Sequence, residues 1–166
     1  MATRSTISLE FADGTIGQVY CHWDGYLAHN GKILFENYSD PFILRELIDL
    51  GSVSSLRPNI GIQHPFSKFE INDKSPDVDA LISLYEEAEQ KGWCTFYGRD
   101  RGEGQSDARY FKDFVDYKLN YQREEYNYIL RNMDGVATWF VSSDSSAHAL
   151  LTEAFAREAQ AELEVA

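Results

Sequence analysis

Two Asp-Gly pairs, Asp13-Gly14 and Asp134-Gly135, constrain the fold of this chain more than any other feature of its sequence. An Asp-Gly pair between two strand-like runs is a strong signal for a β-hairpin, because both residues accept the positive φ angles of a tight turn. Such runs flank both pairs, at residues 6–11 and 16–23 and at residues 126–133 and 136–142. The sequence therefore predicts one hairpin near each end of the chain.

Capping residues predict the helices between and after the hairpins. Asp40 suits an N-cap and Pro41 a first helical position, and Gly51 suits the end of the same helix. The same logic predicts a helix from Ser75-Pro76 to Lys91-Gly92. Other expected elements are a short helix at residues 31–38, a strand at 93–97, a helix at 111–122 with Phe111, Phe114, Val115 and Leu119 inward, and a terminal helix from Ser145 or Ser146 to about Leu163.

This order of elements predicts an α+β fold. We expect a mainly antiparallel sheet of about five strands, made of the two hairpins plus one strand, with helices packed on one face. Residues 1–143 are expected to form a single α+β domain, and residues 144–166 a C-terminal helix appendage after a Ser-rich joint.

The charge of the chain narrows the function classes. The 27 acidic residues outnumber the 15 basic ones and give a net charge of −12, which disfavours direct binding of nucleic acid or of an anionic membrane. No signal-peptide region or transmembrane-length apolar run is visible, so we expect a soluble, cytoplasmic protein. The two cysteines, Cys21 and Cys94, are expected to be buried thiols.

Two dense stretches, residues 20–26 and residues 95–103, are expected to meet in space and form a binding surface. Hairpin geometry places Arg4 near the end of the first stretch. Aromatic rings beside arginines suit stacking on a base and pairing with phosphate, and the glycines of the second stretch suit an anion-receiving loop. The candidate binding residues are Arg4, His22, Trp23, Asp24, Tyr26, Tyr97, Arg99, Asp100 and Arg101.

Simpler interpretations of these residues stay open. His22 and Trp23 could be core residues at a strand end. Arg99 and Arg101 could form internal ion pairs. Tyr117 and Tyr121, one helical turn apart, predict either an exposed contact stripe or, by preference, the edge of the core.

No catalytic, cofactor or metal signature is visible in the sequence. Cys21 and His22 are strand neighbours, so their side chains point to opposite faces and cannot pair as nucleophile and base. The remaining histidines lack the spacing of a ligand set. We therefore expect no cofactor and no metal.

Several phrases together resemble a family of small accessory proteins of bacteriophages and prophages, over about residues 2–141. The most specific are the motifs Cys-His-Trp-Asp-Gly-Tyr at residues 21–26 and Tyr-Gly-Arg-Asp-Arg-Gly-Glu at residues 97–103, with further matches at residues 2–7, 30–34, 46–51, 54–56 and 125–128. The resemblance implies a phage-encoded protein that acts in the cytoplasm of an infected bacterial host.

The leading hypothesis is an accessory protein that counters host defence by binding, without catalysis, either a host defence protein or a nucleotide immune signal. One alternative is an acidic DNA mimic that inhibits a nucleic-acid-binding host protein, with carboxylates on residues 86–89 and the terminal helix. Another is a small nucleotide-processing enzyme that uses His22 and Asp24 as acid–base groups. A homo-oligomer through the terminal helix is compatible with the sequence but not specified by it.

Overall fold

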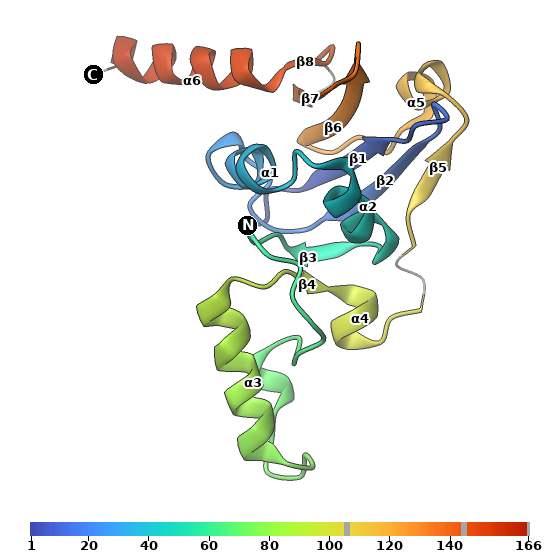
Figure 1. Ribbon diagram of the computed structural model, residues 1–166. Helices are drawn as coiled ribbons and strands as arrows, with labels where there is room; N and C mark the ends of the chain where they lie inside the picture. The colour runs from blue at the N-terminus through green and yellow to red at the C-terminus, as the bar shows by residue number, and fades with distance from the viewer. Residues whose placement is uncertain (105–106, 144–145, 166) are drawn as a thin grey trace.

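The computed structural model describes residues 1–104, 107–143 and 146–165, and it has an α+β fold (Figure 1). Within these residues one mixed sheet runs in the order β4-β3-β2-β1-β6-β7-β8, and β5 pairs with β2 beside β3. The strands are β1 (Ser5–Glu10), β2 (Ile16–Cys21), β3 (Val53–Ser55), β4 (Thr95–Phe96), β5 (Arg109–Phe111), β6 (Tyr126–Met133), β7 (Val136–Ser143) and β8 (Ala149–Leu150).

Both predicted hairpins are present, as β1–β2 and β6–β7. The sheet is larger than the five strands expected, and it is mixed because β1 pairs in parallel with β6 and β2 in parallel with β3. The extra strands β3, β5 and β8 have only two or three residues each. Strands this short cannot show the alternation of apolar and polar residues that identifies a strand in a sequence. They form because a longer neighbouring strand offers free backbone hydrogen-bonding groups.

The helices follow their capping signals where those signals are strong. The Asp40 side chain accepts a hydrogen bond from the Phe42 N–H at 2.9 Å, and Gly51 follows the helix with a φ of +83°. Gly92, with a φ of +67°, ends the next long helix. The helices are η1 (Leu27–Gly31, π-helical), α1 (Lys32–Asn37), α2 (Pro41–Asp49), η2 (Lys68–Glu70, 3₁₀), α3 (Val78–Lys91), α4 (Tyr97–Arg101), α5 (Phe114–Asn120) and α6 (Leu151–Val165).

Helices cover both faces of the sheet, which corrects the expectation of one covered face. On one face α1 and α2 bury Leu34, Leu44 and Leu47 against β1, β2 and β6. On the other face α5 buries Tyr117 against Ile129 of β6. The reason is that β1, β2, β6 and β7 lie inside the sheet and carry apolar or small buried residues on both sides.

The helix predicted at residues 111–122 is shorter than expected, because residues 109–111 pair with β2. Its orientation also differs from the prediction. Val115 is 61% exposed and Leu119 is 74% exposed, whereas Phe111 is buried and Phe114 is partly buried. The helix therefore packs through Tyr117, and an apolar pair remains on its outer side.

The terminal helix α6 begins at Leu151, five residues after Ser146, so Ser146 is not its N-cap. The other predicted cap, Ser145, lies outside the described residues. The first turns of α6 pack on the domain, since Leu151 is buried and Phe155 contacts the core. Whether residues 144–166 form a separate appendage stays a prediction. In the part of the chain that the structure describes, no helix combines the length and the apolar character needed to cross a membrane.

Candidate functional site

The two stretches that the sequence singles out lie on either side of β3. The His22 N–H donates to the Val53 carbonyl oxygen at 3.0 Å. The Tyr97 N–H donates to the Ser52 carbonyl oxygen at 3.2 Å. One short strand therefore separates the end of β2 from the start of α4, and the two stretches share one end of the sheet.

Arg4, Tyr20, His22 and Trp23 gather at the end of the first hairpin. The antiparallel register brings Arg4, which precedes β1, to the side of His22, which follows β2. His22 Nδ1 lies 2.7 Å from the Tyr20 hydroxyl, and the His22 ring meets the Trp23 ring edge-on at 4.6 Å. Burial raises the pKa of Tyr20, and the Arg4 guanidinium opposes that rise. The group forms an aromatic surface on which Trp23 is 42% exposed.

Arg99 is an internal structural residue. Its Nε donates to Asp100 Oδ1 at 3.0 Å. One terminal nitrogen donates to the carbonyl oxygens of Ile60 and Gly61 at 3.0 and 3.1 Å, and the other donates to that of Cys94 at 2.9 Å. The guanidinium therefore joins three carbonyl groups and a buried carboxylate, as the internal ion-pair alternative predicts.

Arg101 is also engaged within the chain, although it lies on the surface. Its guanidinium donates to Glu70 at 3.2 Å and to Glu103 at 3.4 Å, and it lies 4.2 Å from the centre of the Phe66 ring. The Phe66 ring is 5.5 Å from that of Tyr97, whose hydroxyl pKa is raised by burial. A ligand at this position would have to displace the two carboxylates.

The expected anion-receiving loop is instead the short helix α4. The Gly102 N–H donates to the Gly98 carbonyl oxygen at 2.9 Å, and the Glu103 N–H donates to the Tyr97 carbonyl oxygen at 3.1 Å. Gly102, with a φ of +75°, ends the helix. The backbone N–H groups at the end of this segment are therefore used inside α4, which is why they do not form an anion-binding turn.

Asp24 and Tyr26 shape the turn from β2 into η1. Asp24 has a φ of +57°, and its carbonyl oxygen accepts a hydrogen bond from the Asn30 N–H at 3.2 Å. Tyr26 is 41% exposed, and its ring lies 6.0 Å from that of His29. Among the predicted site residues, Tyr26 and Trp23 thus offer the largest exposed aromatic surface.

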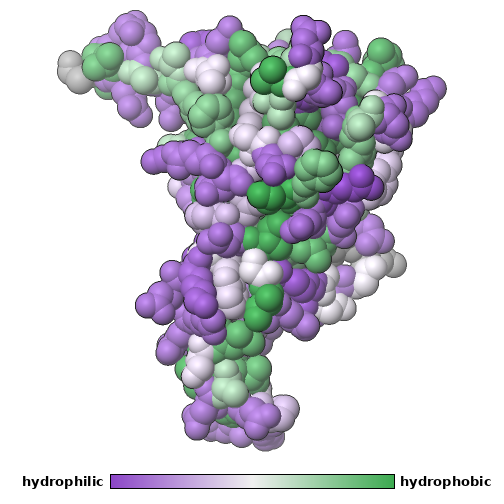
Figure 2. Space-filling view, viewed as in Figure 1, coloured by the Kyte–Doolittle hydropathy of each residue, from purple (hydrophilic) through white to green (hydrophobic). Residues whose placement is uncertain are grey.

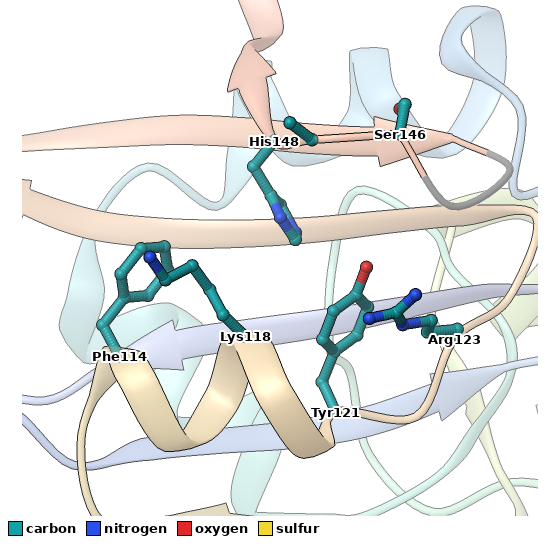
Figure 3. A pocket seen from close by; sticks show the side chains of 7 residues that line it. Phe114, Lys118, Tyr121, Arg123, Ser146 and His148 are labelled. Atoms are coloured by element: carbon teal, nitrogen blue, oxygen red, sulfur yellow. The ribbon is translucent and has the colours of Figure 1, made fainter.

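A pocket of about 490 Å³ lies between α5 and the segment that joins β7 to β8 (Figure 3). Its size falls within the range of small-molecule sites. The lining residues are Phe114, Lys118, Tyr121, Arg123, Ser146, Ala147 and His148. None of these residues is acidic, although the chain carries a net charge of −12. The pocket is therefore a local concentration of cationic and aromatic side chains.

Two cations of this pocket lie close to aromatic rings. The Lys118 ammonium is 5.2 Å from the centre of the Phe114 ring, and the Arg123 guanidinium is 5.1 Å from the centre of the Tyr121 ring. Figure 3 shows His148 pointing from the opposite wall toward Tyr121. Among residues 1–104, 107–143 and 146–165, neither Lys118 nor Arg123 has a carboxylate within ion-pair distance.

Buried rings hold the two walls of the pocket together. The Tyr117 and Tyr121 rings stack with their centres 4.8 Å apart, and the Tyr117 hydroxyl lies 3.2 Å from His148 Nε2. The Tyr121 hydroxyl lies 3.4 Å from Ser142 Oγ. Both tyrosines are buried, which confirms the core-edge interpretation and excludes the exposed stripe.

Burial, together with the nearby cations Arg123 and Arg131, lowers the pKa of His148 to about 4. His148 is therefore neutral at pH 7. The unfolded chain binds a proton at its histidines near pH 6.5, whereas folded His148 does so only near pH 4. The contribution of neutral His148 to the free energy of unfolding is thus fully present above pH 6.5. It is lost as the pH falls from 6.5 to 4.

We expect His148→Asn to reduce the acid sensitivity of folding. Between pH 7 and pH 4.5 the free energy of unfolding of the natural chain should fall by about 1–2 kcal/mol more than that of the variant, a range that allows for partial solvent screening of this half-buried group. Urea denaturation of both proteins at the two pH values measures this difference. An equal fall in the free energy of unfolding of both proteins would contradict the lowered pKa of His148.

The sequence pattern did not reveal this pocket, because its walls come from distant segments. Lys118 lies on α5 and Arg123 comes just after it. His148 reaches them only because Val141 of β7 pairs with Ala149 of β8. A signal was nevertheless present. Residues 109–123 carry four basic side chains in a strongly acidic chain.

Other chemistry in the structure is limited. Both cysteines are buried, as predicted, and burial raises the pKa of Cys21 to about 12. Within the described ranges, no group of three or more His, Cys, Asp or Glu side chains is arranged to hold a metal ion. No protein-family model, no curated protein and no solved structure matches this chain.

Proposed function

We propose that this chain is a phage accessory protein that counters host defence by binding a small nucleotide signal without catalysis, in the pocket between α5 and the β7–β8 segment. The observation that carries the proposal is the presence of Lys118 and Arg123 beside aromatic rings in a pocket whose described lining residues include no carboxylate. The phage setting comes from the sequence resemblance.

The two kinds of side chain match the two parts of a nucleotide. Lys118 supplies a compact positive charge and Arg123 a planar fork, and both groups favour phosphate. The partly exposed His148 ring, whose centre lies 5.4 Å from that of the buried Tyr121 ring, provides aromatic surface for a base. Stacking of a base on an aromatic side chain contributes about 1–3 kcal/mol.

The state of His148 favours binding over turnover. Among the lining residues, His148 has the ordinary pKa closest to 7. Its pKa of about 4 in this structure keeps it neutral at pH 7, so it is not an imidazolium acid and is only a weak base. Its Nε2 atom is also engaged with the Tyr117 hydroxyl at 3.2 Å. The lining residues are therefore better suited to binding a ligand through positive charge and aromatic surface than to transferring a proton.

Isothermal titration with AMP, ADP, ATP and a cyclic dinucleotide tests the proposal. We expect Lys118→Met and Arg123→Met each to raise the Kd of the bound nucleotide at least about tenfold, and the double variant about a hundredfold, since each removes one charge-assisted contact to phosphate. Lys32→Met/Arg45→Met is the matched control, because both residues are exposed basic side chains outside this pocket. Circular dichroism checks that every variant folds.

Three results would contradict the proposal. The first is no binding of any tested nucleotide, and the second is unchanged affinity in the double variant. The third is conversion of the nucleotide during incubation, detected by chromatography and lost in His22→Ala, which would favour the enzymatic alternative. If binding is confirmed, phage plating on a defended host should show that the double variant no longer protects the phage.

A further inference from the structure

The two cations of the pocket lie at opposite ends of a row of three aromatic rings. Phe114, Tyr117 and Tyr121 follow at intervals of three and four residues, and their rings stack in that order with centre-to-centre distances of 5.8 and 4.8 Å. The Lys118 ammonium is 5.2 Å from the centre of the first ring, and the Arg123 guanidinium is 5.1 Å from that of the third. Each cation therefore contacts a different end of the row.

The geometry of the helix sets the length of this row. Phe114 and Tyr121 are seven residues apart, so their positions differ by about 10 Å along the helix axis. Figure 3 shows the Lys118 side chain reaching toward Phe114 on one side of the pocket, and Arg123 beside Tyr121 on the other. In the same view His148 points into the space between them. In this arrangement the two positive charges face different parts of a bound ligand.

The charge of the lining is also defined. Among the described lining residues, only Lys118 and Arg123 carry a positive charge at pH 7, because His148 is neutral there. Arg131 lies near the same row of rings but outside the lining, and its guanidinium is paired with Glu10 at 3.2 Å. Figure 2 shows hydrophilic and hydrophobic residues side by side at the end of the molecule where Figure 1 places α5. The pocket therefore presents two single charges with aromatic surface between them.

We propose that the nucleotide signal bound in this pocket is a cyclic dinucleotide. Its macrocycle holds two phosphodiester groups on opposite sides, each with one negative charge, so that one group contacts Lys118 and the other contacts Arg123. One of its bases lies on the partly exposed ring of His148. The phosphates of ADP or ATP are joined directly to each other and place their charge at one end of the molecule. The inference rests on the proposed function, because it names the class of nucleotide that the same pocket binds.

The order of affinities separates this proposal from simple attraction between charges. Isothermal titration at fixed ionic strength compares cyclic di-AMP, cyclic di-GMP and cyclic GMP–AMP with the linear 5′-phosphorylated dinucleotide and the nucleoside diphosphate of the same bases. We expect the preferred cyclic dinucleotide to bind at least about tenfold more tightly than the diphosphate, which carries more negative charge. It should also bind more tightly than the linear dinucleotide, whose open chain has to be ordered on binding. Attraction between charges alone predicts that the diphosphate binds more tightly than the cyclic dinucleotide.

Lys118→Met and Arg123→Met show whether the two cations contact separate phosphate groups. For the cyclic dinucleotide each substitution should raise the Kd about tenfold and the double variant about a hundredfold, because the two contacts are independent. For the nucleoside diphosphate, whose charge lies at one end, one of the two substitutions should account for the whole loss of affinity. Lys112→Met is the matched control, because Lys112 is an exposed basic residue just before α5 and outside the lining.

Three results would overturn the cyclic dinucleotide and leave the proposed function in place. The first is a nucleoside diphosphate that binds as tightly as every cyclic dinucleotide, and the second is a linear dinucleotide that does so. The third is a double variant that binds the cyclic dinucleotide no more weakly than the weaker single variant, which would mean that both cations contact one phosphate. Absence of binding by every nucleotide tested would overturn the proposed function together with this inference.

Discussion

Replacing Asp100 with alanine is expected to lower the free energy of unfolding by about 3–5 kcal/mol, the range for removing one partner of a buried ion pair. The Asp100 side chain is fully buried and accepts hydrogen bonds from the backbone N–H groups of His64 and Phe96 at 3.1 and 2.8 Å. It also accepts two from Arg99 at 3.0 and 3.2 Å. The substitution leaves both N–H groups without their acceptor and the guanidinium, only 12% exposed, without its counter-charge.

Urea denaturation measures this loss, and Glu89→Ala is the control. Glu89 forms an ion pair with Arg57 at 3.4 Å, but both side chains are partly exposed, so its removal should cost less than about 1 kcal/mol. Equal midpoints for Asp100→Ala and Glu89→Ala would show that Asp100 is not a structural centre. The prediction also has a practical consequence, since loss of activity in an Arg99 variant would report unfolding rather than loss of a ligand contact.

Gly61→Ala is expected to destabilise the chain by about 3 kcal/mol, the sum of a left-handed backbone and an overpacked contact. Gly61 has a φ of +68°, and an added methyl group would overlap the Trp93 side chain. The Gly61 carbonyl oxygen is also one of the acceptors of Arg99, at 3.1 Å. A shift of this backbone away from Trp93 would therefore disturb the same network.

Gly102→Ala separates the two causes. Gly102 has a φ of +75°, but an added methyl group there would have no neighbour within 4 Å, so only the backbone term of about 1–2 kcal/mol applies. Thermal and urea denaturation of both variants should show Gly61→Ala as clearly the less stable. Equal stabilities of the two variants would mean that the Trp93 side chain moves away from the added methyl group without lowering the free energy of unfolding.

Local chemistry was enough to predict the parts of the fold that depend on neighbouring residues. The turn at Asp134-Gly135 and the Asp40 cap of α2 are formed by atoms within a few residues of each other. The parallel pairing of β1 with β6 depends on no such local signal. It joins Thr6 to Asn127, whose side chains share a hydrogen bond of 2.9 Å across 121 positions.

The same distinction applies to the candidate sites. The register of the first hairpin pairs Ser5 with Cys21, so it places Arg4, which precedes Ser5, at the same end of the sheet as His22. The sequence could not show that Arg99 faces inward, because its acceptors at Ile60 and Gly61 belong to a segment without regular structure. It also could not assemble the pocket, since His148 reaches α5 only through the pairing of β7 with β8.

The parallel contact between β1 and β6 has a consequence for how the chain folds. During synthesis, β1 emerges early but remains an open edge on that side until β6 has been made, about 120 residues later, as the Thr6–Asn127 separation of 121 positions requires. Proteins whose central contacts join distant segments fold more slowly than proteins with local contacts. Until then the hairpin exposes unpaired backbone groups that favour association between nascent chains. Expression at low temperature or slow induction should therefore raise the yield of folded protein.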